Sequence, residues 1–452
     1  MDAFLMQKQY FQSGATLPLE QRLAHLNTLY HGIKRFEPQI LEALRCDLGK
    51  SPEESYMTEV GLCLTEIRHT MRHLRDWARP RYVPTPLMHF PASSKIVREP
   101  LGVCLGIAPW NYPFLLAIGP IISALAGGNC IALKPSEYAP ATAAVLERLL
   151  SACFDKRLCR TVTGGAEAAA AETARPYNLI FFTGSAAVGR KVMAAAAENL
   201  TPVVLELGGK SPRIVDETAD LPTAAARIIW GKCLNSGQTC VAPDYVLVAR
   251  SRKDALIREM QKAIHRFYGE DPCENRAYPR IVSERHFDRI AAMLPEDPVV
   301  GGRVDRETLK IEPTLIETNL DDTSPLMTEE IFGPLLPILP YDSIQEALGY
   351  IRSKPQPLAL YLFSRNKKLQ RRVTETISFG GGCINDTISH ITSPCLPFGG
   401  VGESGMGAYH GRFGFETFTH AKSILSKPFQ PDIPVRYPPL AGKQSLLHKI
   451  LR

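Results

Sequence analysis

The chain has 452 residues, enough for two or three domains, each with a sizeable buried core. Hydrophobic residues make up 45% and charged residues 22% of the sequence, as in a soluble globular protein, which excludes a disordered or fibrous chain. Lysine and arginine outnumber aspartate and glutamate by six, 52 against 46, and they are scattered along the chain. So mild and dispersed an excess gives no reason to expect nucleic acid as a partner.

The cysteines and histidines give no sign of a disulfide framework or a metal site. The eleven cysteines, an odd number, contain no C-x-x-C pair, which indicates reduced thiols in a cytoplasmic protein. The histidines include no H-E-x-x-H motif, so we expect no metal. The N-terminus lacks the features of a signal peptide, and the most apolar stretch, Phe114 to Ala126, is too short to span a bilayer. We therefore expect no membrane partner.

The first 100 residues predict helices and then an extended segment. Apolar residues at helical spacing mark one helix around Leu19 to Tyr30, and a second helical run extends from Thr58 to Trp77. Four prolines between Arg79 and Pro91 exclude a helix interior. They predict an extended linker, or an edge element that could reach another subunit.

From Gly102, short apolar runs alternate with helical stretches, the pattern of a parallel sheet with crossover helices. Strands are predicted at Val103–Ile107, Cys130–Leu133, Arg160–Thr163, Leu179–Phe182 and Val203–Leu205. Helices are predicted at Leu115–Ala126, Thr142–Ala152 and Ala187–Glu198. This α/β pattern indicates a doubly wound, Rossmann-like domain, in which a ligand binds beyond the carboxyl ends of the strands. A second α/β unit follows to about Gly400, with helices predicted near Leu221–Leu234 and Arg252–Tyr268.

Two glycine-containing segments resemble nucleotide-binding motifs without meeting their requirements. The segment G-V-G-E-S-G, residues 400–405, is not followed by a crossover helix with an acidic residue, so we interpret it as a loop with positive φ angles. The segment G-K-S, residues 209–211, lacks the first glycine of a P-loop because Val204 stands in its place.

The C-terminal L-L-H-K-I-L-R is basic and amphipathic; it could touch an anionic membrane, but a solvated or packed tail is the simpler interpretation.

Three polar residues stand where chemistry is expected. Cys240 lies in N-S-G-Q-T-C-V-A-P, residues 235–243, and is either a nucleophile or a buried structural thiol. Glu206 ends an apolar stretch, and only Leu207 separates it from two glycines; burial there would raise its pKa and suit it as a general base, although it could instead cap the next helix. Asn111, in P-W-N-Y-P, could donate a hydrogen bond to an oxyanion or serve as an ordinary turn residue.

These motifs, with others in the same order along nearly the whole chain, resemble those of the NAD(P)-dependent aldehyde dehydrogenases. The further motifs are L-K-P-S-E at Leu133–Glu137, F-T-G-S within Phe181–Arg190, L-E-L-G-G-K-S-P, E-E-I-F-G-P at Glu329–Pro334 and L-P-F-G-G-V-G-x-S-G-M-G-A-Y-H-G at Leu396–Gly411. The V-A-P-D-Y that follows the cysteine and the G-A-Y-H-G ending are most similar to the class 3 branch.

The resemblance implies a catalytic set and a cofactor. Cys240 would attack the aldehyde carbonyl as a thiolate, and Asn111 with the Cys240 backbone N–H would hold the oxyanion. Glu206 would activate the water that hydrolyses the thioester, with Glu330 as the alternative base. The residues that match the family's cofactor contacts are Trp110, Lys134, Glu137, Gly184, Ser185, Gly189, Leu207, Gly208, Glu330 and Phe332.

NAD is the expected cofactor, because a carboxylate at Glu137 would bind the ribose hydroxyls and repel the 2′-phosphate of NADP. NADP stays an alternative, since relatives with the same motif use both.

The expected substrates are medium-chain aliphatic or aromatic aldehydes, although core packing would explain each apolar residue of the supposed tunnel equally well. These residues are Tyr112, Phe114, Trp230, Ile391 and Phe398. Cys383 stands where class 3 relatives usually have another small residue, which bears on substrate range.

The resemblance also implies three parts and a homodimer. The NAD(P)-binding domain would comprise residues 1–78 and 99–206, the catalytic domain 207–400, and a small β bridging element 79–98 and 401–440, with a tail at 441–452. The bridging element would extend the sheet of the partner subunit. Two rival functions are an acylating dehydrogenase that passes the thioester to coenzyme A, against which Glu206 argues, and a non-catalytic protein on the same scaffold.

Overall fold

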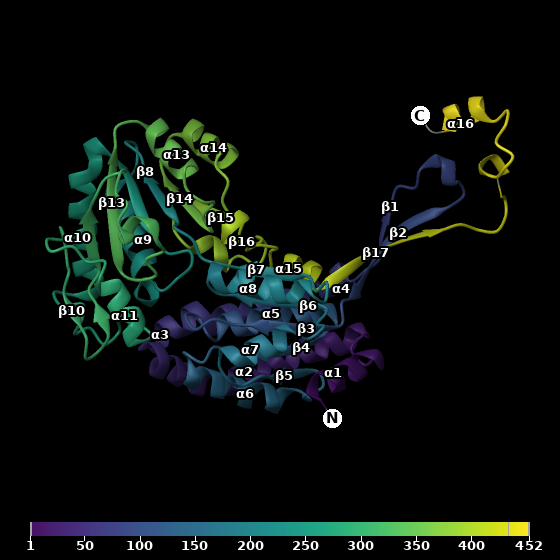
Figure 1. Cartoon of the computed structure of the whole chain (residues 1–452), viewed down its shortest axis with the longest axis horizontal. Helices are drawn as coiled ribbons and strands as arrows, with labels where there is room; N and C mark the ends of the chain where they lie inside the picture. Colours follow the sequence, from purple (N-terminus) through teal and green to yellow (C-terminus); the bar gives the residue numbers. More distant parts are fainter. Residues whose placement is uncertain (1, 433, 451–452) are drawn as a thin grey trace.

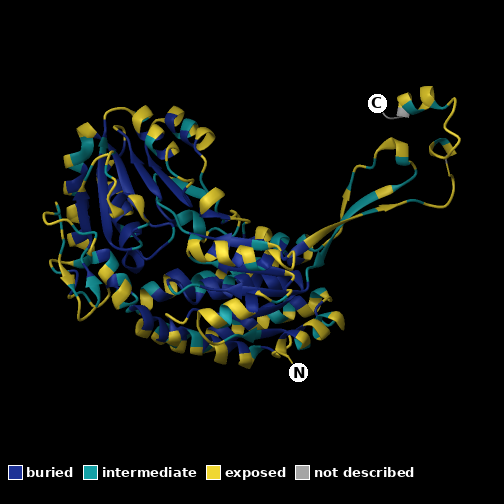
Figure 2. Ribbon diagram, in the orientation of Figure 1, coloured by how far each residue is buried: buried dark blue, intermediate teal, exposed yellow. Residues whose placement is uncertain are grey.

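The structure is a computed structural model that describes residues 2–432 and 434–450. Two six-stranded sheets form separate lobes, and a three-stranded antiparallel sheet projects from them as an arm (Figure 1). Buried residues gather along the two large sheets, whereas the arm is mostly half-buried or exposed (Figure 2). The predicted α/β class, with two sheet-based units and a small β element, is confirmed.

The first sheet has the strand order β16-β7-β6-β3-β4-β5. Its parallel strands are β3 (Val103–Ile107), β4 (Cys130–Lys134), β5 (Cys159–Thr161), β6 (Leu179–Thr183) and β7 (Val203–Glu206), and the short β16 (Gly405–Met406) pairs antiparallel to β7. The side chains of β3 and β4 are buried throughout, which explains their unbroken apolar runs. All five predicted strands are present, with ends within two residues of the prediction.

Helices pack around this sheet. They are α1 (Ala3–Gln12), α2 (Leu19–Leu48), α3 (Pro52–Ser55), α4 (Gly61–Trp77), α5 (Leu115–Gly127), α6 (Pro140–Cys153), α7 (Ala166–Thr173), α8 (Ala186–Ala197) and α15 (Gly411–Thr417), with a π-helical turn at Tyr56–Val60. Helix α5 is apolar all round because it lies between the sheet and helices α2, α4 and α15. The three helices predicted in this region correspond to α5, α6 and α8.

The second sheet has the order β12-β13-β9-β8-β14-β15, and all its strands are parallel. The strands are β8 (Pro212–Val215), β9 (Tyr245–Ala249), β12 (Thr314–Glu317), β13 (Leu335–Tyr341), β14 (Ala359–Phe363) and β15 (Gly381–Ile384). The helices of this lobe are α9 (Leu221–Cys233), α10 (Lys253–Tyr268), α11 (Glu284–Ala291), α12 (Pro325–Thr328), α13 (Ile344–Arg352) and α14 (Lys367–Thr376). A hairpin joins β10 (Val304–Asp305) to β11 (Lys310–Ile311). The two predicted helices correspond to α9 and α10.

The arm consists of β1 (Arg81–Val83), β2 (Ser93–Pro100) and β17 (Thr419–Ser426), and β17 pairs with β2 along its whole length. The segment with four prolines thus becomes β1 and a 3-10 turn at Leu87–His89. Helix α16 (Gln444–Ile450) lies beyond β17 (Figure 1). The predicted element 401–440 contains β16 and α15 of the first lobe as well as β17 of the arm, and the domain boundaries stay predictions. No helix within 2–432 and 434–450 is both long and apolar enough to cross a membrane.

Candidate active site

Two cavities between the large lobes meet at Cys240 and Glu206. The first, the polar cavity, has a volume of about 230 Å³ and is lined by polar side chains, glycines and aromatic rings of both lobes. The second, the apolar cavity, has a volume of about 90 Å³ and is lined mainly by hydrophobic side chains. The residues common to both are Leu116, Thr183, Glu206, Leu207 and Cys240. A thiol and a carboxyl therefore stand where a polar and an apolar cavity join.

The polar cavity brings together ten of the thirteen residues predicted for the site. They are Trp110, Asn111, Gly184, Ser185, Glu206, Leu207, Gly208, Cys240, Glu330 and Phe332. Lys134 and Glu137 lie outside its lining, at and just after the end of β4, with Lys134 Nζ 3.0 Å from Glu137 Oε2. Gly189 lies near the start of α8. Sequence reasoning missed Thr183, which its F-T-G-S motif could have shown, and His286 and Arg289, which carry no motif.

Cys240 follows a tight turn at the end of α9. Gly237 in this turn has a φ of 76°, and a Cβ on it would lie 2.2 Å from the Gly333 carbonyl oxygen, so only glycine fits there. The side chain of Gln238 is fully buried. It forms hydrogen bonds with the backbone of Asn235, Arg280 and Val282. The close approach of Gly237 to Gly333 and the hydrogen bonds of Gln238 thus fix the residues before Cys240. We call residues 235–241 the nucleophile turn.

The Cys240 side chain is half-buried and reaches both cavities, unlike Cys104 and Cys130, which are fully buried in the first sheet. Burial raises the pKa of the Cys240 thiol to about 12, and the carboxyls of Glu330 and Glu206 add to this effect. The neutral thiol is therefore the resting form, and a positive charge brought into the polar cavity would favour the thiolate. The position in both cavity walls favours a nucleophile over a structural thiol.

Glu206 is the last residue of β7 and is 2% exposed. Neither of its carboxyl oxygens has a hydrogen-bond partner among the described residues. Burial raises the pKa of Glu206 well above its ordinary value. The element that follows is strand β8, so the alternative interpretation as a helix cap was wrong. A buried carboxyl that is free of other bonds and faces both cavities is suited to exchange a proton with water.

Hydrogen bonds in both directions join Asn111 to the nucleophile turn. The Asn111 side chain is buried, and its Nδ2 donates to the Gln238 carbonyl oxygen at 3.0 Å. The Asn111 backbone carbonyl accepts hydrogen bonds from the Asn235 amide at 2.7 Å and from the Lys50 ammonium at 3.3 Å. A side-chain amide has two N–H donors, and the second one on Asn111 has no partner among the described residues, so it remains for an oxyanion in the polar cavity.

An ion pair that sequence reasoning missed supports the Asn111 loop. Lys50 Nζ and Glu59 Oε1 are 2.6 Å apart, and both side chains are fully buried. The other Glu59 oxygen accepts from the N–H groups of Phe114 and Leu115, and Lys50 Nζ lies 4.0 Å from the centre of the Tyr112 ring. Lys50 is 61 residues from Asn111 and Glu59 is 55 residues from Phe114, so no local pattern indicates this contact.

Glu330 lies over the backbone of Gly208, where a Cβ would fall 2.0 Å from Glu330 Oε2. An ion pair of Lys210 with Asp244, 2.6 Å between Nζ and Oδ2, holds this segment, because Asp244 also accepts from the Ile331 N–H. Burial, followed by the charge of Asp244, raises the pKa of Glu330 to about 8. A carboxyl in this place can accept hydrogen bonds from sugar hydroxyls.

Groups that fit a dinucleotide follow one another along the polar cavity. Ser185 caps α8 by accepting from the Val188 N–H, and the free N–H groups of a helix start bind phosphate. A Cβ on Gly189 would lie 2.7 Å from the Leu207 side chain, so this glycine lets α8 pack closely. The rings of Trp110 and Phe332, whose centres are 5.4 Å apart and whose planes meet at 80°, give the cavity an apolar wall. The start of α8 could therefore hold the phosphates of a dinucleotide, Glu330 a sugar, and the rings of Trp110 and Phe332 its nicotinamide ring.

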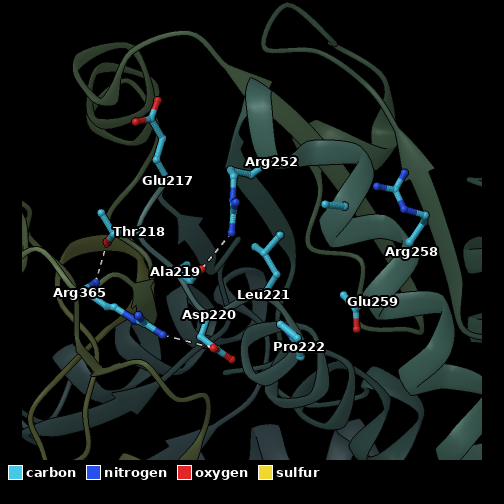
Figure 3. Close-up of a pocket in the computed structure, with 11 residues that line it drawn as sticks. Glu217, Thr218, Ala219, Asp220, Leu221, Pro222, Arg252, Arg258, Glu259 and Arg365 are labelled. Carbon is cyan, nitrogen blue, oxygen red and sulfur yellow. Dashed lines mark hydrogen bonds and ion pairs between the residues drawn. The ribbon is translucent and has the colours of Figure 1, made fainter.

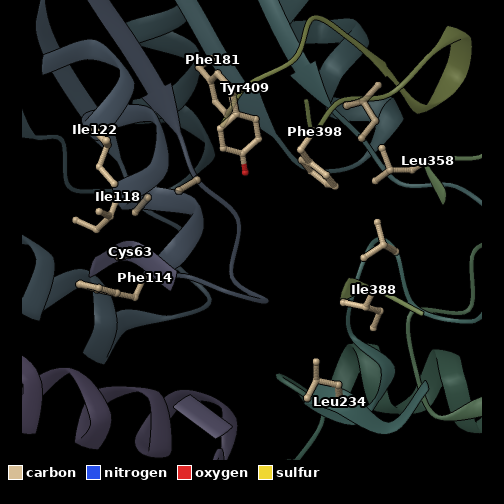
Figure 4. Packing of buried hydrophobic residues seen from close by; sticks show 14 of the residues in the cluster. Cys63, Phe114, Ile118, Ile122, Phe181, Leu234, Leu358, Ile388, Phe398 and Tyr409 are labelled. Carbon is tan, nitrogen blue, oxygen red and sulfur yellow. The ribbon is translucent and has the colours of Figure 1, made fainter. Parts of the chain in front are cut away.

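The apolar cavity contains four of the five predicted tunnel residues: Tyr112, Trp230, Ile391 and Phe398. The prediction for Phe114 was wrong. Its side chain is 0% exposed and lies in the core cluster that also holds Ile118 and Ile122 (Figure 4), because the start of α5 turns this ring away from the cavity. The remaining apolar lining includes Met57, Leu62, Leu115, Leu234 and Ile388. Cys383 lines neither cavity, and its Sγ lies 3.6 Å from the His390 Nδ1.

A larger hollow, about 430 Å³, lies on the surface beside α9 and α10 (Figure 3). Three arginines and three carboxylates line it: Arg252, Arg258, Arg365, Glu217, Asp220 and Glu259. Its charges are balanced, with Arg365 and Asp220 paired at 3.3 Å, and it contains none of the residues predicted for the site. The candidate active site is therefore the pair of joined cavities.

Comparisons with known proteins identify the family of this chain. The model of the aldehyde dehydrogenase family matches residues 3–424. A 4,4'-diaponeurosporen-aldehyde dehydrogenase from Staphylococcus aureus is 46% identical over 97% of this chain and 96% of that protein. Aldehyde dehydrogenase family 3 member H1 from Arabidopsis thaliana is 47% identical over 98% and 93%. The dimeric NADP-preferring aldehyde dehydrogenase from Rattus norvegicus is 44% identical over 96% and 97%.

Among solved structures, the substrate-bound state of Staphylococcus aureus AldH matches with a TM-score of 0.97 and 45% identity. The match covers 100% of this chain and 99% of that chain. Residues 2–432 and 434–450, including the arm, therefore share one architecture with that enzyme.

Proposed function

The chain belongs to the aldehyde dehydrogenase family as an NAD(P)-dependent oxidoreductase that converts aldehydes to carboxylic acids, and we propose that Cys240, Asn111 and Glu206 perform this conversion. The observation that carries the proposal is the junction of the two cavities. The polar cavity has groups suited to a dinucleotide, the apolar cavity has a lining suited to the tail of an aldehyde, and Cys240 and Glu206 line both.

The reaction begins at Cys240. Its thiolate attacks the carbonyl carbon, and the carbonyl oxygen becomes negative. The free N–H of the Asn111 amide and the backbone N–H of Cys240 stabilise that oxygen. Asn111 is ready for this role because its other donor and its backbone carbonyl already fix it to the nucleophile turn.

When bound, NAD(P)⁺ supplies the hydride acceptor that side chains lack, together with a positive charge. The start of α8 would hold its pyrophosphate, Lys134 and Glu137 its adenosine ribose, and Glu330 with Phe332 its nicotinamide end. Glu137 favours NAD, whereas the rat relative is named NADP-preferring. The comparison of NADH with NADPH formation described below decides between the two cofactors.

Loss of hydride leaves the acyl group on Cys240 as a thioester, which water then hydrolyses. Glu206 takes the proton of that water, since its carboxyl reaches both cavities and has no hydrogen-bond partner among the described residues. Glu330 is less suited to this step because its carboxyl lies against the Gly208 backbone. A retained general base also argues against an acylating dehydrogenase.

The apolar cavity favours medium-chain aliphatic or aromatic aldehydes. Its wall combines the rings of Tyr112, Trp230 and Phe398 with aliphatic side chains, so a substrate tail is bound by burial rather than by hydrogen bonds. The Staphylococcus aureus relative is named for 4,4'-diaponeurosporen-aldehyde, which supports an aldehyde as the substrate here.

A homodimer is part of the proposal. The arm exposes large hydrophobic side chains, with Leu87 85% and Phe90 59% exposed. Such side chains on a projecting antiparallel sheet are suited to a partner subunit, and the rat relative is named dimeric. Sedimentation of the full chain would show a dimer; a monomer at micromolar concentration would contradict this part.

The test of the reaction is NADH or NADPH formation from a panel of aldehydes, from acetaldehyde to decanal with benzaldehyde and coniferaldehyde. Wild type and Cys240→Ala are compared, with Cys383→Ala as the control cysteine outside both cavities. We expect turnover that disappears only in Cys240→Ala. Turnover that survives without Cys240 would contradict the mechanism. No turnover in the wild type with cofactor bound would also contradict it, and would favour a non-catalytic protein.

A further inference from the structure

A buried arginine lies directly behind the nucleophile turn. Arg213, on β8, is fully buried. Its Nη1 donates to the Ser211 carbonyl at 2.6 Å, and its Nη2 donates to the Val241 carbonyl at 2.8 Å. Val241 is the residue that follows Cys240, so a guanidinium binds the backbone next to the nucleophile.

Tyr361, on the neighbouring strand β14, binds the same carbonyl. Its hydroxyl donates to the Val241 oxygen at 3.0 Å, and the Arg213 guanidinium lies 4.1 Å from the centre of its ring. The two residues are register partners in the parallel pair of β14 and β8. Two donors on adjacent strands of the sheet thus fix one oxygen of the nucleophile turn.

The charge of Arg213 is not paired. It forms an ion pair with no carboxylate among the described residues, and its Nε has no hydrogen-bond partner there. The titratable groups around it are Tyr361, Asp244, Cys383, Tyr245, Lys232 and His390. Asp244, the one acid in this set, already pairs with Lys210. Lys232 Nζ is buried without a hydrogen-bond partner, so positive groups exceed negative ones behind the turn.

The opposite side of Cys240 faces the polar cavity, which Arg289 also lines. The carboxyls of Glu206 and Glu330 face it there, and the phenols of Tyr112, Tyr361 and Tyr409 complete its titratable neighbours. Each carboxyl disfavours the thiolate when it is ionised. A buried and unpaired cation is costly for stability, and such groups concentrate at functional sites.

We propose that Arg213 is a positioning residue of the reaction: it holds the Val241 carbonyl, and its charge favours the thiolate of Cys240. The proposal rests on the role of Cys240 in the proposed function. Although burial lowers the pKa of Arg213 to about 9, the guanidinium stays charged at neutral pH. Arg213 therefore brings a positive charge to the backbone next to Cys240.

The test measures the rate at which iodoacetamide alkylates Cys240 across a pH range, followed on the Cys240 peptide by mass spectrometry. Arg213→Met should alkylate about tenfold more slowly at neutral pH, because a rise of one unit in a thiol pKa leaves about a tenth of the thiolate. Arg213→Lys keeps the charge and should restore most of the rate. An Arg213→Met profile identical to that of the wild type would overturn the electrostatic role.

Arg22→Met is the matched control. Arg22 is 8% exposed and also donates to two backbone carbonyls, those of Thr16 and Leu17, but it lies on α2 away from the turn. Its alkylation profile should equal that of the wild type. If Arg22→Met slows alkylation as much as Arg213→Met, the effect reflects general loosening of the fold and the proposal fails.

If Arg213→Met does not fold, the variant Tyr361→Phe still tests whether the hydrogen bonds to the Val241 carbonyl position Cys240. It removes one hydrogen bond to the Val241 carbonyl and no charge, so kcat should fall about fivefold while the KM for cofactor and the pH dependence of alkylation stay unchanged. An unchanged kcat would overturn the positioning role. A wild type without Cys240-dependent turnover would refute the proposed function instead, and the alkylation rates would still decide the effect of Arg213.

Discussion

The two cavities that meet at Cys240 are built in different ways. The polar cavity depends in part on backbone that only glycine allows, because a Cβ at Gly237 or Gly208 would overlap a neighbouring group, and on the start of α8. The apolar cavity is a wall of side chains from several elements, each replaceable by another of similar volume. Changes in the polar cavity should therefore abolish chemistry or cofactor binding, whereas changes in the apolar cavity should alter which aldehyde is preferred.

The largest effect is expected for Glu206→Gln. Removal of the general base should lower kcat by about 10²- to 10⁴-fold and leave the thioester in place. Rapid-quench kinetics should then show a burst of NADH close to one per site, followed by slow turnover. If Glu206→Gln keeps normal turnover while Glu330→Gln loses it, Glu330 is the base and the assignment is wrong.

Asn111→Ala should lower kcat by about 10²- to 10³-fold, the effect of removing one oxyanion donor. The KM for the cofactor should stay near its wild-type value, because the amide acts on the aldehyde oxygen. Steady-state kinetics with a single good aldehyde measures both constants. A change confined to KM would indicate that Asn111 only shapes the loop.

Gly208→Ala should raise the KM for the cofactor about tenfold, since a Cβ at this position overlaps the Glu330 carboxyl and displaces it. Gly349→Ala is the matched control, because a Cβ there meets no atom within 4 Å. Cofactor titration by fluorescence compares the two variants. Equal affinities would show that the Glu330 contact with Gly208 has no part in binding.

Ile391→Ala and Trp230→Ala sharpen the comparison on the apolar side. Each should change the ratio of kcat/KM for decanal and acetaldehyde about tenfold, the usual effect of reshaping a hydrophobic pocket. Cofactor affinity and the thioester burst should stay the same. Loss of the burst would mean that these side chains also position the nucleophile turn.

A smaller effect concerns stability and pH. The folded-state pKa of Glu206 is raised above its unfolded value, so the unfolded chain releases this proton first and stability falls as pH rises through that window. Glu206→Gln lacks the group, so its free energy of unfolding should exceed that of the wild type by about 1.4 kcal/mol for each pH unit inside the window. Thermal unfolding at several pH values measures the difference. A difference that shrinks with rising pH would contradict the raised pKa.

Much of the fold and site could be predicted because their signals are local. Buried parallel strands such as β3 and β4 are unbroken apolar runs, and Cys240 and Glu206 stand in motifs beside glycines that the backbone requires. The ion pair of Lys50 with Glu59, and the Arg213 contact with Val241, could not be predicted, since tertiary packing alone joins them. The prediction that Phe114 lines the tunnel was wrong for a related reason: the position of a residue next to a motif does not decide where its ring points. The cytoplasmic location and the domain boundaries stay predictions.

The most direct test of the central claim is peptide mass spectrometry of Glu206→Gln after mixing with NAD and an aldehyde. The account predicts an acyl group on the peptide that contains Cys240, and its absence when either NAD or the aldehyde is omitted. An acyl group on another cysteine, or none on any peptide while NADH still forms, would contradict Cys240 as the nucleophile.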